Sequence, residues 1–195
     1  IGGVLIGFSV LILGMENMTH AMSGAAESPE IQEILLLFKN PFLGVLCGAA
    51  VTAAIQSSSA SIGILQALAA SGAVSYSNAV PIIIGQNIGT CVTAVFSAVG
   101  ANKNAKRVAA VHLCFNIIGA AAFSAVCLAL LSVFGSGISG KAVGSVEIAV
   151  IHSVFNIFSM VLLLPFSRQL ERLACFLVPD KGKDAENELL DERLL

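Results

Sequence analysis

A short run of uncharged polar residues interrupts a long apolar stretch of the sequence. Gln56, Ser57, Ser58 and Ser59, followed by Ser61, place five polar side chains within six residues. An unpaired hydroxyl or amide in an apolar environment costs roughly 2–7 kcal/mol, so these groups need partners. They could form a helix cap with hydrogen bonds between helices, or a polar ligand site at a helix break. Because hydroxyls both donate and accept, such a site could bind an oxyanion or a desolvated cation.

A second polar cluster follows further along the chain. It comprises Gln86 and Asn87, which lie between two glycines, and then Thr90 and Thr93, which are one helical turn apart. Their amide and hydroxyl oxygens are hard, neutral ligands that suit an alkali cation. Helix N-termini at the same breaks would present free N–H groups to an anion.

The region that holds both clusters carries no charge. No Lys, Arg, Asp or Glu lies between Lys39 and Lys103, a run of 63 positions. A bound oxyanion would therefore have to be balanced by helix dipoles and by co-bound cations. This balance favours an ion-coupled symporter over a simple binding pocket.

Four glycines have the small-x-x-x-small spacing that is typical of closely packed membrane helices. The pairs are Gly44 with Gly48 and Gly85 with Gly89. We expect them to allow close backbone approach. The second pair could also supply unusual backbone dihedral angles at a helix break.

A pattern of His-x-x-Phe-Asn occurs twice, at His112–Asn116 and, 40 residues later, at His152–Asn156. In each copy the histidine and asparagine are four residues apart and share one helix face. We favour a structural role, in which two matched helices form hydrogen bonds inside a bundle. The alternative is a proton-sensitive element, because histidine titrates near neutral pH.

The composition is typical of a membrane protein. Of the 195 residues, 56% are hydrophobic and 11% are charged, against about 25% charged in a soluble domain. With 10 basic and 12 acidic residues, the chain has no excess of positive charge to bind a phosphate backbone. A soluble enzyme, a disordered chain and a nucleic-acid binder are therefore excluded, and we expect no catalytic residues and no cofactor. The cysteines lack Cys-x-x-Cys spacing, so we interpret them as small buried hydrophobic residues.

The uncharged runs define the expected helices, since about 20 apolar residues cross a bilayer. Residues 1–15 are expected to end one spanning helix, and 108–134 and 148–166 to form two more. Between Lys39 and Lys103, polar clusters, Pro81 and glycines divide the sequence into apolar pieces too short to span alone. Such pieces indicate discontinuous helices that line a transporter site. We therefore expect an all-α membrane protein with discontinuous or re-entrant helices beside spanning helices.

Basic residues predict the orientation in the membrane. One group lies at 103–107, and another follows the last expected span, within residues 168–183. Two crossings separate the groups, so both are expected in the cytoplasm, and the loop with Lys141 on the other side. Residues 167–195 are polar and acidic, and we expect them to form a cytoplasmic linker in a segment of a larger protein.

Several motifs, taken in order, resemble the type II sodium/phosphate cotransporter family. They are Asn-Pro-Phe-Leu-Gly at 40–44, Gln-Ser-Ser-Ser-Ala-Ser at 56–61, Gly-Gln-Asn-Ile-Gly-Thr at 85–90 and Asn-Ala-Lys-Arg at 104–107. The resemblance covers residues 1–166 and implies one half, most similar to the second, of a transporter built from two inverted repeats. The first repeat would then be a partner, in the same chain or in a second copy. In bacterial members a PhoU-like domain commonly follows, here after the 167–195 linker.

The resemblance implies sodium-coupled symport of inorganic phosphate across the plasma membrane, the inner membrane of a bacterium. Phosphate would bind Gln56, Ser57, Ser58 and Ser59 together with Gln86 and Asn87. Sodium ions would be coordinated by Ser59, Asn87, Thr90 and Thr93. The alternatives are a symporter of another small oxyanion, an ion channel, or a non-transporting membrane anchor or sensor for a cytoplasmic regulatory domain.

Overall fold

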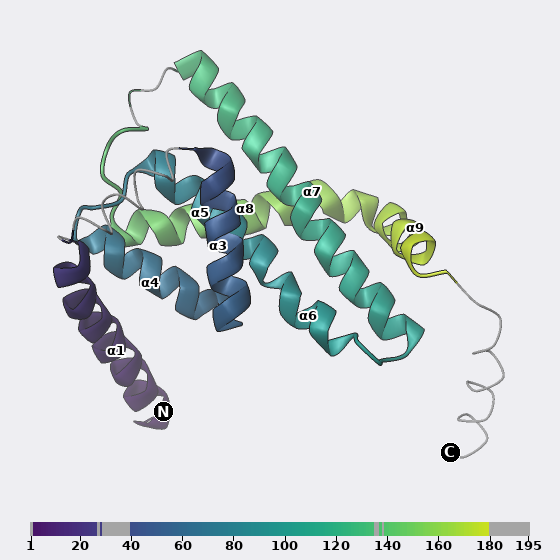
Figure 1. Cartoon of the computed structure of the whole chain (residues 1–195), viewed down its shortest axis with the longest axis horizontal. Coiled ribbons are helices and arrows are strands. Elements are labelled where there is room, and N and C mark those ends of the chain that lie inside the picture. Colours follow the sequence, from purple (N-terminus) through teal and green to yellow (C-terminus); the bar gives the residue numbers. More distant parts are fainter. Residues whose placement is uncertain (1, 27, 29–39, 135–136, 138, 180–195) are drawn as a thin grey trace.

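A computed structural model describes residues 2–26, 28, 40–134, 137 and 139–179. Every regular element in these ranges is a helix (Figure 1). The elements are α1 (Gly2–Ala26), α3 (Pro41–Ile55), α4 (Ser58–Ala70), α5 (Tyr76–Gly89), α6 (Cys91–Ser97), α7 (Lys103–Phe134), α8 (Ser145–Leu163), the 3-10 helix η1 (Leu164–Phe166) and α9 (Ser167–Leu177). The prediction of an all-α protein is confirmed.

Within the described residues, four helical segments are long and apolar enough to cross a membrane. They are Gly2–Ala21, Tyr76–Ser97, Lys103–Ser132 and Ser145–Leu177. The spans expected at 108–134 and 148–166 are thus found in α7 and α8. We expected the first helix to end near residue 15, but it continues to Ala26. Glu16, Met15 and Met18 are good helix formers, so the polar residues among them do not by themselves end the helix.

Helices α3 and α4 form a hairpin of two short arms. Asn40 caps α3 by accepting a hydrogen bond from the N–H of Phe42 at 3.0 Å, and Pro41 occupies the first turn. The arm ends at Gln56, which has a left-handed φ of 57°. Ser57 then caps α4 by accepting from the N–H of Ala60 at 3.3 Å. With 15 and 13 residues the arms are only about 22 and 20 Å long, shorter than a hydrocarbon core of about 30 Å.

Helix α5 is more continuous than its sequence suggested. It runs without a break through Pro81 and through Gly85, Gln86 and Asn87, and is interrupted only at Thr90, before α6. The expected breaks at Pro81 and at 85–87 are therefore wrong. Gly85 and Gly89 both lie within α5, and neither has a positive φ. They serve to pack α5 against α3.

Glycines bring the backbones of α3 and α5 into direct contact. A Cβ atom on Gly48 would overlap the carbonyl oxygen of Ile82, and one on Gly85 would overlap that of Val45. A Cβ on Gly89 would lie 2.5 Å from the carbonyl oxygen of Ala49. The close approach predicted from the glycine spacing is confirmed. Since these contacts advance in the same direction along both helices, α3 and α5 run parallel, and the end of α5 lies beside Ala49 and Thr52, about one turn before the end of α3.

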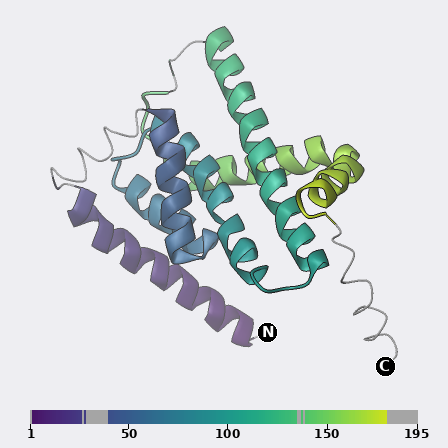
Figure 2. The same ribbon diagram turned by 45° about the vertical axis from the view of Figure 1, so that its right-hand side comes forward.

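The remaining helices surround this pair. Helix α4 packs between α1 and α8, and α1 lies on the outside of the molecule in both views (Figures 1 and 2). Ile83 and Ile148 lie in one buried cluster between α4, α5 and α8. Phe123 of α7 and Phe155 of α8 meet edge-to-face in another, with ring centroids 5.3 Å apart.

The two ends of α7 have different neighbours. At its first turns, the Nε of Arg107 donates to the carbonyl oxygen of Val178 at 3.2 Å, so α9 lies beside the basic group at 103–107. Beyond its other end, the Lys141 carbonyl accepts from the N–H of Tyr76 at 3.1 Å. Helix α9 also shows that residues 167–177 of the expected linker are helical. The acidic residues 180–195, and residues 135, 136 and 138, lie outside the described residues.

Substituting Gly48 should test the α3–α5 contact. We expect Gly48→Ala to lower the free energy of unfolding by roughly 1–3 kcal/mol or more, because the added methyl group meets backbone that cannot rotate away. The thermal midpoint of purified protein in detergent measures this. Gly14→Ala is the matched control, since a Cβ there meets nothing within 4 Å. Equal midpoints for the two variants would contradict the packing.

A labelling experiment should test the orientation of α7. In a cysteine-free background, Lys106→Cys and Lys141→Cys are expected to react with an impermeant maleimide from opposite sides of the membrane. The reason is that α7, about 48 Å long with its 32 residues, separates the two positions. Labelling of both from the same side would refute a membrane-spanning α7.

Candidate functional site

The Gln-Ser-Ser-Ser run forms the tip of the α3–α4 hairpin. Gln56 and Ser59 are exposed there, and Ser57 and Ser58 are half-buried. The hydroxyls of Ser57 and Ser59 lie 3.2 Å apart and share a hydrogen bond. Ser58, in contrast, makes no side-chain hydrogen bond with any other residue in the described ranges. The tip therefore combines a capped helix start with one hydroxyl that is available to a ligand.

Directly behind the tip, three buried polar side chains tie α3, α4 and α5 together. Thr52 donates its hydroxyl hydrogen to the Oγ of Ser61 at 2.8 Å. Gln86 donates from Nε2 to the same Oγ at 2.9 Å and to the carbonyl oxygen of Ser61 at 3.0 Å. We refer to Thr52, Ser61 and Gln86 as the buried triad. It holds the first turn of α4 against both parallel helices.

The triad leaves one strong acceptor unused. Gln86 is 2% exposed, and its Oε1 has no hydrogen-bond partner among the residues that the structure describes. Both lone pairs of Ser61 Oγ accept hydrogen bonds, so its own hydrogen remains to be donated. Buried polar atoms are usually satisfied, and an orphan among them calls for an explanation such as a bound water or ion.

Sequence reasoning missed Thr52. Its signal was present, because Thr52 is the one polar side chain in the apolar segment 41–55 and lies one turn before Gln56 on the same helix face. What the sequence did not show was its partner, since Ser61 reaches Thr52 only after the chain has reversed at the hairpin tip.

The second predicted cluster lies at the end of α5, and its hydrogen bonds are local. Asn87 Nδ2 donates to the Ile83 carbonyl at 2.9 Å. Thr90 Oγ1 donates to the Asn87 carbonyl at 2.6 Å, and Thr93 Oγ1 donates to the Thr90 carbonyl at 2.9 Å. No hydrogen bond in the described part of the chain joins Asn87, Thr90 or Thr93 to the hairpin tip. Of the predicted cluster, only Gln86 is linked to it, through Ser61.

Three helix ends meet at this level and give the site its electrostatic character. Helix α3 ends here, α4 begins here at Ser58, and α5 is interrupted nearby at Thr90, directly before α6 begins. Helix C-termini carry partial negative charge and favour cations, whereas an N-terminus carries partial positive charge and favours anions. Neutral side chains thus occupy a place that presents both kinds of electrostatic potential.

The two His-x-x-Phe-Asn copies do not pair as expected. Asn116 donates to the His112 carbonyl at 3.0 Å, and Asn156 donates to the His152 carbonyl at 2.8 Å. Both bonds lie within one helix rather than between helices. Asn116 is buried whereas Asn156 is exposed, so the copies do not share an environment. The first copy does take part in a bond between helices, because Cys91 Sγ of α6 donates to the His112 carbonyl at 3.6 Å, but among the described residues the two copies form no matched pair of such bonds.

Comparison with known proteins shows related sequences, and no solved structure matches. "Uncharacterized protein YqeW" of Bacillus subtilis is 29% identical over 93% of this chain and 58% of its own length. "Sodium-dependent phosphate transport protein 2A" of Rattus norvegicus is 34% identical over 58% of this chain and 19% of its own length. "Putative inorganic phosphate export protein YjbB" of Escherichia coli is 25% identical over 93% of this chain and 33% of its own length.

The chain thus spans about 58% of YqeW and smaller fractions of the other two relatives. A family profile described as Na+/Pi-cotransporter matches residues 10–150, which include the hairpin tip, the buried triad and the end of α5. The chain belongs to the Na+/Pi-cotransporter family.

Proposed function

We propose that this chain forms one of two inverted halves of a symporter that moves inorganic phosphate together with sodium ions across the plasma membrane. The observation that carries the proposal is the neutral polar tip between two helices that are too short to cross a bilayer. Irregular backbone at membrane depth is tolerated where it is buried in protein or lines a water-filled cavity. The hairpin is then re-entrant, and its tip lies at the transport site.

Phosphate binds at the beginning of α4 in this proposal. Its oxygens accept hydrogen bonds from the hydroxyls of Ser57, Ser58 and Ser59 and from the first-turn amides of the helix. The amide groups of Gln56 and Asn87 complete the set of donors, whereas Gln86, whose two N–H groups bind Ser61, takes part by holding the first turn of α4 in place. Ser58 is the best-placed side chain, because its hydroxyl has no other partner among the described residues.

Sodium ions bind at the ends of α3 and α5, where the helix dipoles favour positive charge. Ser59, Asn87, Thr90 and Thr93 supply hydroxyl and amide oxygens for them. The threonine hydroxyls use their hydrogens on carbonyl groups of their own helix, so their lone pairs remain for a cation. A symporter runs in either direction, so the gradients decide between uptake and export.

The rest of the arrangement rests on the basic residues, which indicate the cytoplasmic side, and on the family resemblance, which implies the neighbouring domains. Residues 103–107 and 168–195 are cytoplasmic, and residues 167–195 lead toward a PhoU-like domain. The other half of the site comes from a first repeat in the same chain or from a second copy.

Ser58→Ala tests the phosphate site in the protein encoded by the complete reading frame. We expect phosphate uptake at low substrate concentration to fall about tenfold or more, because a hydrogen bond to a charged ligand contributes about 1.5–3 kcal/mol. Radiolabelled phosphate uptake into proteoliposomes with an inward sodium gradient measures this. Sodium should also raise phosphate affinity, and phosphate should raise sodium affinity by the same factor.

Ser71→Ala is the matched control, since Ser71 lies at the far end of the same helix and bonds only locally, to the Leu68 carbonyl at 2.6 Å. Equal uptake with sodium, with potassium and without a gradient would exclude sodium coupling. Transport of sulfate or a carboxylate instead would keep the architecture and discard the substrate. Absence of any transport would leave the anchor or sensor as the better function.

Thr52→Val tests whether the buried triad positions the tip. The change keeps the shape of the side chain but removes one hydrogen bond from Ser61, so the half-saturating phosphate concentration should rise by roughly fivefold or more. In a double-mutant cycle with Ser61→Ala, the two effects should be coupled by about 0.5–3 kcal/mol.

Thr19→Val serves as the control, because Thr19 makes a local bond to the Met15 carbonyl at 3.0 Å on α1. If Thr52→Val lowered only protein yield and left the phosphate dependence unchanged, the triad would have no role in positioning the tip.

A further inference from the structure

Helix α9 has a buried side, a polar side and an exposed apolar side. No contact within the described structure accounts for the exposed apolar side. Leu170 and Ala174 are buried on the side where α9 packs against α7. Leu173 and Leu177, with Phe176 at 78% exposure, form an apolar side that is open in the described structure. An exposed apolar side next to a polar one is the mark of a helix that lies in a membrane interface.

The polar side of α9 carries two arginines, which lie in line with Phe176. Arg168, Arg172 and Phe176 follow each other at four-residue spacing, so they line one edge of the helix. Glu171 lies on the side of this row away from Phe176, by the 100° advance per residue of an α-helix. Arg168 and Arg172 are exposed and make no hydrogen bond or ion pair with another residue in the described ranges.

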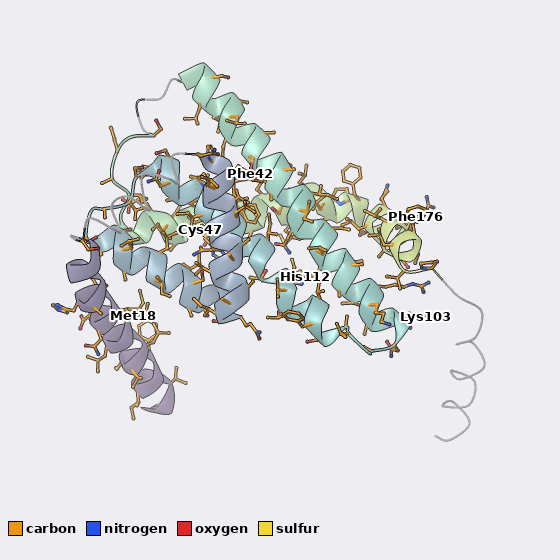
Figure 3. All side chains as sticks on the ribbon, in the orientation of Figure 1. Met18, Phe42, Cys47, Lys103, His112 and Phe176 are labelled. Atoms are coloured by element: carbon orange, nitrogen blue, oxygen red, sulfur yellow. The ribbon has the colours of Figure 1, made fainter. Side chains whose placement is uncertain are left out.

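The neighbouring end of α7 adds to the positive charge. Because Arg107 holds the end of α9 at the start of α7, the exposed Lys106 lies at the same end of the molecule. Figure 3 shows Phe176 and Lys103 projecting at this end. Lys106 likewise makes no hydrogen bond or ion pair with another described residue. A cluster of basic side chains beside a spanning helix attracts acidic lipid headgroups.

The position of α9 places it at the membrane surface. It follows α8 directly, and the 3-10 helix η1, which contains Pro165, joins the two. Leu164 and Phe166 in this joint are exposed, as expected for side chains that face lipid. Within the candidate span Ser145–Leu177, the 19 residues of α8 are by themselves nearly enough to cross a bilayer, and α9 with its arginine edge forms the last part of this segment, after η1.

We propose that α9 is an interfacial helix that binds acidic phospholipid headgroups through Arg168, Arg172 and Lys106, with Phe176 and Leu173 inserted among the acyl chains. The charges match the headgroup phosphates, and arginine suits them because its planar fork can donate two parallel hydrogen bonds to one phosphate. Lipid bound here contacts both α9 and the first turns of α7. This site is separate from the hairpin tip and does not depend on the transported substrate.

The depth of α9 is tested with a pair of single cysteines in a cysteine-free background of the complete protein. Phe176→Cys and Glu171→Cys, each labelled with an environment-sensitive fluorophore in phosphatidylglycerol liposomes, report opposite sides of the same helix. The label at 176 should be quenched by lipids brominated near the headgroup, and the label at 171 by aqueous iodide. Equal iodide quenching at both positions would overturn the proposal. Protection of 176 from both quenchers would assign that side to a protein contact and overturn it as well.

The headgroup site is tested by titrating the detergent-solubilised protein with phosphatidylglycerol and, in parallel, with phosphatidylcholine. Arg168→Gln with Arg172→Gln should weaken phosphatidylglycerol binding about twenty- to thirtyfold, taking about 1 kcal/mol for each charge. Arg168→Lys with Arg172→Lys should retain most of the binding. The variants must keep the wild-type thermal midpoint without lipid. Equal affinity for both lipids, or displacement by millimolar inorganic phosphate, would refute a lipid-headgroup site.

Discussion

Helices α3 and α5 touch along their backbones, and the polar centre of the molecule depends on this contact. Gly48 and Gly85 allow the approach because neither has a side chain to hold the helices apart. The packing is therefore van der Waals contact between backbone atoms, which is a principal source of helix association in lipid, where the hydrophobic effect does not drive helices together. At this separation Gln86 on α5 reaches Ser61, and Thr52 on α3 reaches the same hydroxyl.

The sequence predicted those features that depend on neighbours along one helix. The glycine spacing indicated close packing, and the uncharged runs located α7 and α8. It did not predict features that depend on contacts between segments distant in the sequence. Thr90, rather than Pro81, interrupts α5, and the glycines that were expected to break it pack against α3 instead. The partners of Thr52 and the packing of α9 on α7 arise from contacts between distant segments, which no local pattern records.

The two His-x-x-Phe-Asn copies also show that a local pattern does not predict the surroundings of a residue. Their spacing is identical, and each asparagine bonds back to the histidine carbonyl of its own helix. The spacing predicted only that each histidine and asparagine share one helix face, and the hydrogen bonds expected between matched helices were not predicted correctly. It could not predict that Asn116 faces the protein whereas Asn156 is exposed, since that difference depends on which helices pack nearby.

A neutral site constrains how a transporter of this family can handle an anion. Helix ends contribute typically about 0.3–1 kcal/mol each and up to about 2 kcal/mol in partly buried geometries. Removing an unpaired ion from water costs tens of kcal/mol in the idealised limit, so dipoles and hydroxyls alone do not stabilise a multiply charged anion. With no Lys or Arg between residues 39 and 103, the compensating charge must come from outside this segment. In the symport proposed above, co-bound cations supply this charge when they bind, so phosphate and sodium each increase the affinity for the other.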